Sequence, residues 1–164
     1  MGEREAVGQR DGQPQYRQAR EPGRNKQLLR RLFDAWSRGD MRPLVDAMAD
    51  DFRWVFPGSW SGAGVWQPKT AVVEELLRGQ LATQFAERFE SHPEFILADS
   101  NRVVVQTHGR TTTTRGDAYN NVYCLIFTVD GNKLTEVIEH CDTSLVDRVL
   151  QPPQPGVQGW SRPE

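Results

Sequence analysis

The sequence predicts an α+β domain in which N-terminal helices pack on a cone-shaped, curved and mainly antiparallel sheet. Segments with helical spacing of apolar residues come first, and segments rich in β-branched and aromatic residues follow one another from residue 94 to residue 142. Turn sequences separate these later segments, which favours hairpins. Long strands that bend around helices leave a cone, and we expect its mouth to be a hydrophobic pocket.

Three helices are expected in the first half of the chain. The first covers residues 25–40, ends at Gly39, and has apolar side chains at helical spacing: Leu28, Leu29, Leu32, Phe33 and Trp36. The second, within residues 41–51, follows Asp40 as its cap and has a proline in its first turn. A first strand over residues 52–57 comes next. The third helix starts at Thr70, and its apolar face comprises Val72, Val73, Leu76, Leu77 and Leu81.

Four further strands are expected, within residues 94–99, 101–114, 118–129 and 133–142. The sequences "RGD" and "DGN" between them are turn signals, and the second is typical of a hairpin. A last helix over residues 144–150 closes the domain, with Asp142 or Thr143 as its cap.

The domain is expected to cover residues 24–150, with a tail at each end. Residues 1–23 contain hardly any apolar side chains, so they bury too little surface to offset the entropy of ordering, and we expect a disordered tail. Residues 151–164 are rich in proline, which disfavours regular structure, and we expect a second tail there.

Composition limits the classes of partner. The chain has 164 residues, of which 37% are hydrophobic and 26% charged, with a formal net charge of -2, so neither nucleic acid nor an anionic membrane is expected as a partner. The sequence lacks an apolar signal-peptide core and an apolar run of membrane-spanning length, which favours a cytoplasmic protein. Cys124 and Cys141 lie in strand-like segments and are interpreted as buried thiols, and no metal is expected.

Three segments carry a family resemblance: "LFDAWSRGDMRPLVDAMADDFRWVFPG", "AYNNVYCLIFTVDGNKL" and "EVIEHCDTSLVDRVL". They resemble the SnoaL-like branch of the nuclear transport factor 2-like superfamily, which also contains ketosteroid isomerase, limonene epoxide hydrolase and the phenazine-pathway A/B proteins. The resemblance implies the cone-shaped fold and a homodimer formed through the outer sheet face, where Val122, Ile126 and Ile138 are apolar.

Strand parity separates two ionisable residues of the last strand. Val137, Glu139 and Cys141 share one face, whereas Ile138 and His140 share the other, so one of the two ionisable groups points inward. In relatives with a polar residue at the Glu139 position, that residue enters the cone. The resemblance therefore implies that Glu139 is the catalytic acid/base and that His140 lies outside.

Matching the strand over residues 101–114 to the same family sets His108 and Arg110 in the pocket as well, on the face of Val104 and Gln106. A carboxyl group in an apolar cone is pushed toward its neutral form, so Glu139 is poised to donate or accept a proton near neutral pH. His108 is expected to share or relay this proton as a second catalytic residue. Arg110 either holds a substrate oxygen or forms a structural ion pair with Glu139.

Aromatic side chains are the expected walls of the pocket for a ring-shaped ligand: Trp54, Phe56, Trp60, Trp66, Tyr119 and Tyr123. Core packing is the alternative interpretation for at least half of them. Asn121 and Tyr123 are expected to place an amide and a phenol near the mouth, as the resemblance to the phenazine proteins and SnoaL-like cyclases implies.

The predicted function is a cofactor-independent acid/base enzyme of the polyketide cyclase or isomerase type, acting on a small hydrophobic ring-containing substrate. A faithful steroid isomerase is not expected, because Phe33 and Trp36 stand in the first helix where that family has a tyrosine. Epoxide hydrolase-like activity is a further alternative, although Arg53 and Val55 replace the residues that position its water. The remaining alternative is a non-catalytic small-molecule-binding or protein-interaction module of the same fold.

Overall fold

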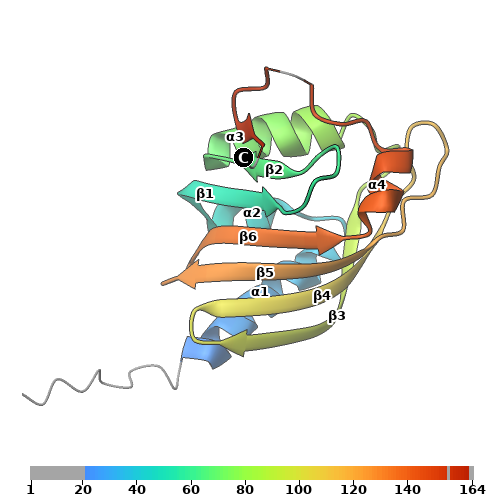
Figure 1. The fold of residues 1–164 in the computed structure, drawn as a ribbon. Helices are drawn as coiled ribbons and strands as arrows, with labels where there is room; N and C mark the ends of the chain where they lie inside the picture. The colour runs from blue at the N-terminus through green and yellow to red at the C-terminus, as the bar shows by residue number, and fades with distance from the viewer. Residues whose placement is uncertain (1–20, 155, 163–164) are drawn as a thin grey trace, which may run out of the picture.

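One curved sheet of seven strands dominates the computed structural model, which describes residues 21–154 and 156–162 (Figure 1). The strand order is β3-β4-β5-β6-β1-β2-β7. All neighbours are antiparallel except β1 (Met48–Phe56) and β6 (Lys133–Cys141), which run parallel. The predicted α+β class with a curved, mainly antiparallel sheet is confirmed.

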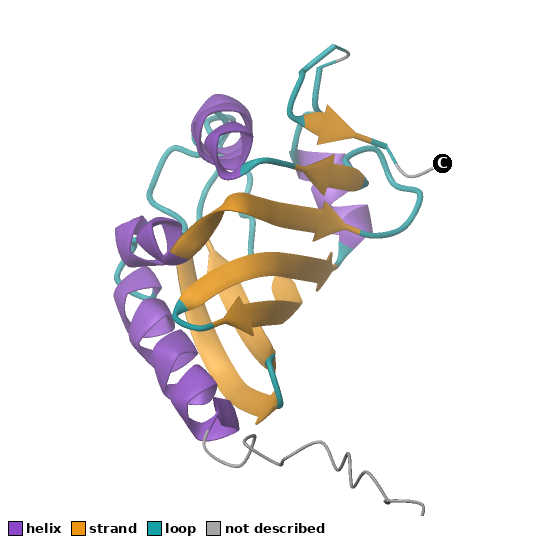
Figure 2. Cartoon of the chain, turned by 90° about the vertical axis from the view of Figure 1, so that its left-hand side faces the viewer, coloured by secondary structure: helices purple, strands orange, loops and turns teal. Residues whose placement is uncertain are grey.

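The other strands are β2 (Gly64–Trp66), β3 (Glu90–Asp99), β4 (Arg102–Arg110), β5 (Val122–Asp130) and β7 (Trp160–Ser161). The helices are α1 (Glu21–Trp36), α2 (Arg42–Ala47), α3 (Lys69–Ala71), the π-helix η2 (Val72–Leu81) and α4 (Thr143–Val149). Figure 2 shows α1 and α2 along one face of the curved sheet. No helix of the described residues is long and apolar enough to cross a membrane.

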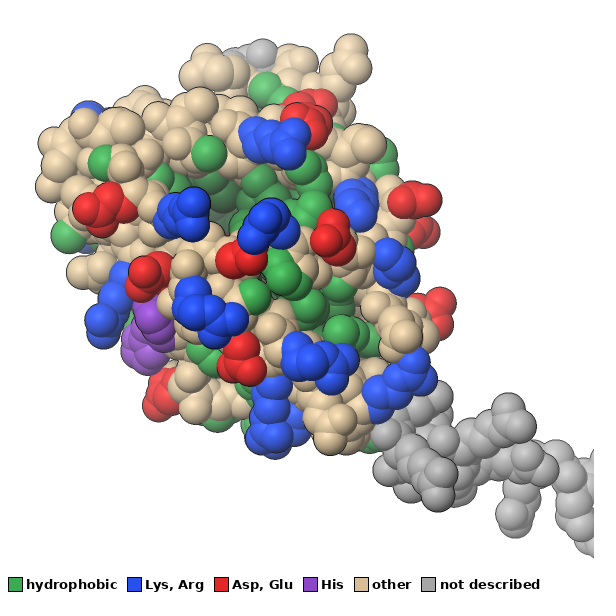
Figure 3. All heavy atoms as spheres, turned by 180° about the vertical axis from the view of Figure 1, so that it is seen from behind, with side chains coloured by type: hydrophobic (Ala, Val, Ile, Leu, Met, Phe, Trp, Pro, Cys, Tyr) green, Lys and Arg blue, Asp and Glu red, His purple; other side chains and the backbone are tan. Residues whose placement is uncertain are grey.

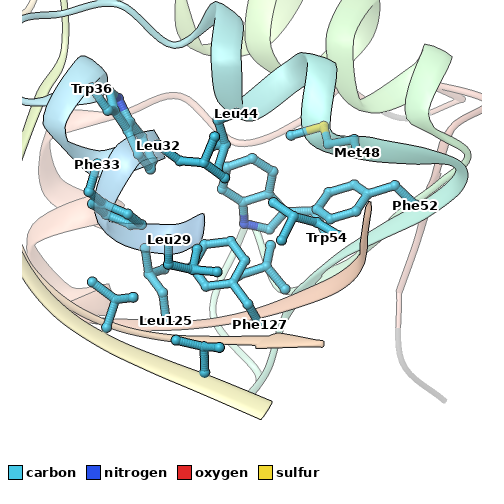
Figure 4. Close-up of a cluster of buried hydrophobic side chains, with 14 of the residues drawn as sticks. Leu29, Leu32, Phe33, Trp36, Leu44, Met48, Phe52, Trp54, Leu125 and Phe127 are labelled. Atoms are coloured by element: carbon cyan, nitrogen blue, oxygen red, sulfur yellow. The ribbon is translucent and has the colours of Figure 1, made fainter. Parts of the chain in front are cut away.

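The core lies between α1 and the concave face of the sheet. Leu29 and Phe33 of α1 are fully buried, and the Phe33 ring meets the edge of Phe127 of β5 at 6.0 Å between centroids. Figure 4 shows these helix side chains facing Leu125 and Phe127 of the sheet. Burying a large apolar side chain contributes about 1.5–3 kcal/mol, so this contact holds the helix layer on the sheet.

The third helix differs in type from the expected one, because most of it is a π-helix. Its last turn shows the wider spacing, since the amide of Ala82 donates to the carbonyl oxygen of Leu77 at 2.9 Å. Leu76, Leu77, Gln80 and Leu81 of this helix line the cavity described below. π-helical turns are rare and often lie at functional sites.

Both expected tails need correction where they are described. The first helix begins at Glu21, inside the segment expected to be disordered, and Asn25 in its second turn donates to the carbonyl oxygen of Ser100 at 3.1 Å. Residues 1–20 lie outside the described part of the chain. Residues 160–161 form β7, which pairs with β2, and the Trp160 ring lies 6.3 Å from that of Trp66. Proline content did not reveal this docking, because the aromatic contact that stabilises it is distant in the sequence.

Strand and helix ends also differ from expectation. β1 begins at Met48 rather than at residue 52, and β3 begins at Glu90 rather than at residue 94. The last helix starts at Thr143, and of the two expected caps it is Asp142 that accepts a hydrogen bond from the amide of Leu145.

Candidate active site

A cavity of about 470 Å³ lies between the concave sheet face, the π-helix and the segment that follows α4. Its wall is mainly apolar, and it includes residues from β1, β5, β6, η2 and α4. From behind, the molecule has a hollow with a hydrophobic floor, and Lys, Arg, Asp and Glu side chains surround it (Figure 3). A cavity of this size and character suits a small hydrophobic ligand.

All six aromatic side chains expected in the pocket lie in this wall: Trp54, Phe56, Trp60, Trp66, Tyr119 and Tyr123. Trp54 and Phe56 alternate on β1 and stack with their ring centroids 6.0 Å apart. Trp60, in the loop after β1, meets the Phe56 ring edge-on at 5.9 Å. These three rings therefore contact one another in a row, with Trp54 and Phe56 nearly parallel and Trp60 perpendicular to Phe56.

Glu139 is the acidic side chain that β6 turns into the cavity. It lies opposite Leu125 of β5, and both residues belong to the wall. The indole nitrogen of Trp54 donates a hydrogen bond to Oε2 of Glu139 at 2.9 Å, which fixes the orientation of the carboxyl group. The neighbouring His140 is exposed on the opposite face, so the predicted parity of this strand is confirmed.

The cavity changes the acidity of this carboxyl group. Removal from water raises the pKa of Glu139 from 4.5 to about 7, and the hydrogen bond from Trp54 opposes this effect only in part. Among the described residues, Glu139 has no ion-pair partner. The group is therefore divided between its acid and base forms near neutral pH, which suits proton transfer.

The expectation that His108 and Arg110 share the cavity with Glu139 is wrong. On β4 the buried residues are Val103, Val105, Thr107 and Gly109, so His108, between the last two, lies on the outer face. The imidazole of His108 is half exposed and lies 3.3 Å from the Glu94 carboxylate. Arg110 is exposed on the same outer face, which excludes an ion pair with Glu139.

The expected face was the wrong one because valines occupy both sides of β4. Val104 and Gln106, which were expected to face inward, are only partly buried, whereas Val103 and Val105 are fully buried. A shift of one residue moves every side chain of a strand to the other face.

Asn121 lies beside the cavity rather than in its wall. Its amide bridges to the backbone of Asp142, with Oδ1 accepting from the amide nitrogen at 3.0 Å and Nδ2 donating to the carbonyl oxygen at 3.2 Å. Nδ2 also donates to the hydroxyl of Tyr119 at 3.3 Å, and the hydroxyl of Tyr123 donates to the same oxygen at 3.0 Å. The expected amide and phenol groups are thus joined in one buried network.

Several wall residues were not predicted from the sequence. The Phe85 ring stacks on the Tyr119 ring at 5.7 Å between centroids, and the Phe89 ring lies tilted against it at 6.4 Å. Pro152 and Pro153, which follow α4, also belong to the wall. The spacing of four residues between the two phenylalanines could have indicated that they share one side of the chain and belong to the aromatic wall. The prolines lie in the segment expected to be a tail, and nothing in its sequence indicated a place in the cavity wall.

Glycine at position 109 allows the aromatic rings to approach β4. A Cβ atom there would lie 2.3 Å from Phe89 and 2.7 Å from Tyr123, closer than van der Waals contact permits. Gly109 therefore determines where the ring of Tyr123 rests, and with it the hydroxyl that contacts Tyr119.

Potential metal ligands do not gather at the cavity. Within residues 21–154 and 156–162, no group of three or more His, Cys, Asp or Glu side chains is arranged to hold a metal ion. Cys141 is the thiol in the wall, and burial raises its pKa to about 12. A thiol of this kind stays protonated, so it is a packing group rather than a nucleophile.

Residues 29–137 match the model of the SnoaL-like domain family. An uncharacterized protein of Mycobacterium tuberculosis (strain H37Rv) is 27% identical over 112 residues, which are 68% of this chain and 84% of that protein. A nuclear transport factor 2-like protein of unknown function from Burkholderia pseudomallei has a TM-score of 0.66 at 22% identity, over 77% of this chain and 97% of that one. A candidate SnoaL-like polyketide cyclase from Jannaschia sp. CCS1 has a TM-score of 0.64 at 18% identity, over 81% of this chain and 95% of that one. Likenesses at such identities support the fold.

Proposed function

This chain belongs to the SnoaL-like domain family, and from that premise we propose that it is a cofactor-independent acid/base enzyme of the cyclase or isomerase type. The observation that carries the proposal is the Glu139 carboxyl group, held by Trp54 in an apolar cavity with a pKa of about 7. The substrate is a hydrophobic, ring-containing small molecule, since the wall around this carboxyl group is mainly apolar and rich in aromatic side chains.

Proton removal from a carbon next to a carbonyl group is the step that this arrangement suits. Oε2 of Glu139 accepts the indole N–H of Trp54, which leaves Oε1 as the atom that takes the proton. The electron pair of the broken C–H bond forms a C=C bond, and the carbonyl π pair moves to its oxygen. The resulting enolate attacks a second carbonyl in a cyclase, or is reprotonated at another carbon in an isomerase.

The cavity supplies the remaining conditions for this chemistry. Apolar walls keep water from the enolate, and stacked rings such as Trp54 and Phe56 orient a flat substrate. A volume of about 470 Å³ accommodates a molecule of a few fused rings.

Hydrogen exchange in a simple ring ketone tests the proposal without knowledge of the natural substrate. The exchange of the α-hydrogens of 2-tetralone is followed by NMR in D₂O with the wild-type protein. We expect acceleration over buffer, and Glu139→Gln should reduce it by about 100-fold or more because Gln accepts no proton. His140→Gln, on the exposed face, is the matched control and should retain the rate.

A non-catalytic binding module of the same fold predicts a different result. Such a protein would bind 2-tetralone, with the melting temperature rising as the ligand is added, but would leave its exchange rate at the buffer value. Equal rates for the wild type and Glu139→Gln would reject Glu139 as the base.

We also propose that the protein is a homodimer that pairs through the outer face of the sheet. Phe95, Leu97 and Val122 are 41%, 57% and 48% exposed there. Apolar side chains that are exposed together are stabilised when a second copy covers them.

A further inference from the structure

The side-chain amide of Asn121 has only one orientation that satisfies its neighbours. The backbone amide of Asp142 donates to it at 3.0 Å, so the acceptor Oδ1 must lie there. Nδ2 then faces the carbonyl oxygen of Asp142 and the hydroxyl of Tyr119, at 3.2 and 3.3 Å. The reversed amide would place two donors face to face in a buried site, because Asn121 is only 2% exposed.

This orientation determines the hydrogen-bond roles of the Tyr119 hydroxyl. Its oxygen accepts from Asn121 and, at 3.0 Å, from the hydroxyl of Tyr123. A phenol oxygen accepts two hydrogen bonds and donates one. Both acceptor positions are filled, so the O–H of Tyr119 remains to be donated. Among residues 21–154 and 156–162 no acceptor takes it.

The free O–H belongs to a side chain of the cavity wall. Tyr119 is 4% exposed, and its ring packs against Phe85 and Phe89, which restricts its rotation. The hydroxyl accepts hydrogen bonds from Asn121 and Tyr123, and Tyr119 is a residue of the cavity wall.

Burial keeps this phenol a donor. Removal from water raises the pKa of Tyr119, and the negative charge of Glu139 raises it further, so the hydroxyl stays protonated throughout the physiological range. The pKa of Tyr123 is also raised well above its ordinary value, mainly by burial. Glu139 and both tyrosines line the same cavity.

We propose that Tyr119 is a catalytic hydrogen-bond donor to the substrate oxygen that becomes negative when Glu139 removes the neighbouring proton, with Asn121 and Tyr123 as its positioning residues. The inference rests on the proposed acid/base function and narrows its substrate class to enolisable ketones and esters. As the C–H bond breaks, Oε1 of Glu139 gains the proton and the carbonyl oxygen gains the charge. Tyr119 donates to that oxygen and keeps its own proton, so the step is balanced.

Binding of a phenolate measures this donor without any turnover. In Glu139→Gln the carboxyl group is neutral, as it is after it has taken the substrate proton, and 4-nitrophenolate imitates the flat enolate. We expect the protein to favour the ionised form of 4-nitrophenol, detected by its absorbance. Adding Tyr119→Phe to Glu139→Gln should weaken 4-nitrophenolate binding by about 10-fold or more, since a hydrogen bond to a charged oxygen is stronger than one between neutral groups.

Two further variants test the direction of the hydrogen bonds in the same background. Tyr123→Phe removes a donor to Tyr119 but leaves the Tyr119 O–H, so it should weaken phenolate binding less than Tyr119→Phe does. Asn121→Asp introduces an acceptor that captures the Tyr119 O–H, and it should weaken binding as Tyr119→Phe does. If Asn121→Asp does not fold, the comparison of the two tyrosine variants decides. A larger effect of Tyr123→Phe, or no effect of Tyr119→Phe, would overturn the assignment.

The ketone exchange assay separates this inference from the proposed function. Exchange that depends on Glu139 but is unchanged in Tyr119→Phe would overturn the inference and leave the acid/base function standing. Phenolate binding that depends on Tyr119, in a protein that does not accelerate exchange, would support the donor and reject the enzymatic function.

Discussion

Replacing Glu139 with Gln should change how the stability of the protein depends on pH. The pKa of Glu139 is about 7 in the folded protein and 4.5 in its ordinary state, so the folded protein binds the proton more tightly than the unfolded chain does. The contribution of Glu139 to the free energy of unfolding is therefore fully present below about pH 4.5 and is lost as the pH rises through about 7. Between about pH 5 and about pH 8 the wild type should lose about 2.5 kcal/mol through Glu139, at about 1.4 kcal/mol per pH unit.

Urea unfolding at several pH values measures this difference. Gln carries no charge at any pH, so the free energy of unfolding of Glu139→Gln should exceed that of the wild type by a margin that grows with pH. All other titrating groups are shared and cancel in the comparison, and His140→Gln should follow the wild type. Parallel pH profiles for the wild type and Glu139→Gln would refute a desolvated Glu139.

Three further predictions concern the cavity wall and the outer face. Trp54→Phe removes the N–H donor that favours ionised Glu139, so the midpoint of the pH dependence of 2-tetralone exchange should move to higher pH, and an unchanged midpoint would speak against this contact. Gly109→Ala places a Cβ atom 2.3 Å from the Phe89 ring, and urea unfolding should show a loss of about 1–3 kcal/mol, whereas wild-type stability would mean that the rings move aside. Val122→Glu puts a charge on the proposed dimer face and should yield monomers in sedimentation at micromolar concentration, while a wild type that already sediments as a monomer would reject the dimer.

The inward direction of Glu139 was predictable, whereas that of His108 was not. On β6 the fully buried Val137 and the partly buried Glu139 alternate with Ile138 and an exposed His140, and the family pattern supported the same inner face. β4 has apolar side chains on both faces, since Val104 on the outer face lies between Val103 and Val105 on the inner face. Periodicity alone therefore did not identify the inner face of this strand.

Other features depend on contacts that are remote in the sequence. The docking of Trp160 on Trp66 orders a segment whose composition is typical of a tail. The network around Tyr119 could be predicted only as a set of polar residues near the mouth, because its hydrogen-bond direction depends on the backbone of Asp142. Local patterns thus predicted the elements and the aromatic wall, and tertiary contacts determined the polar network.

The most direct test of the account is the NMR titration of the Glu139 side-chain carboxyl carbon. The signal is assigned by its absence from Glu139→Gln in protein labelled with ¹³C at glutamate side chains. The account predicts a midpoint near pH 7, because the carboxyl group lies in an apolar cavity with one indole donor. A midpoint near 4.5 would show a solvated carboxylate and would contradict Glu139 as an acid/base poised at neutral pH.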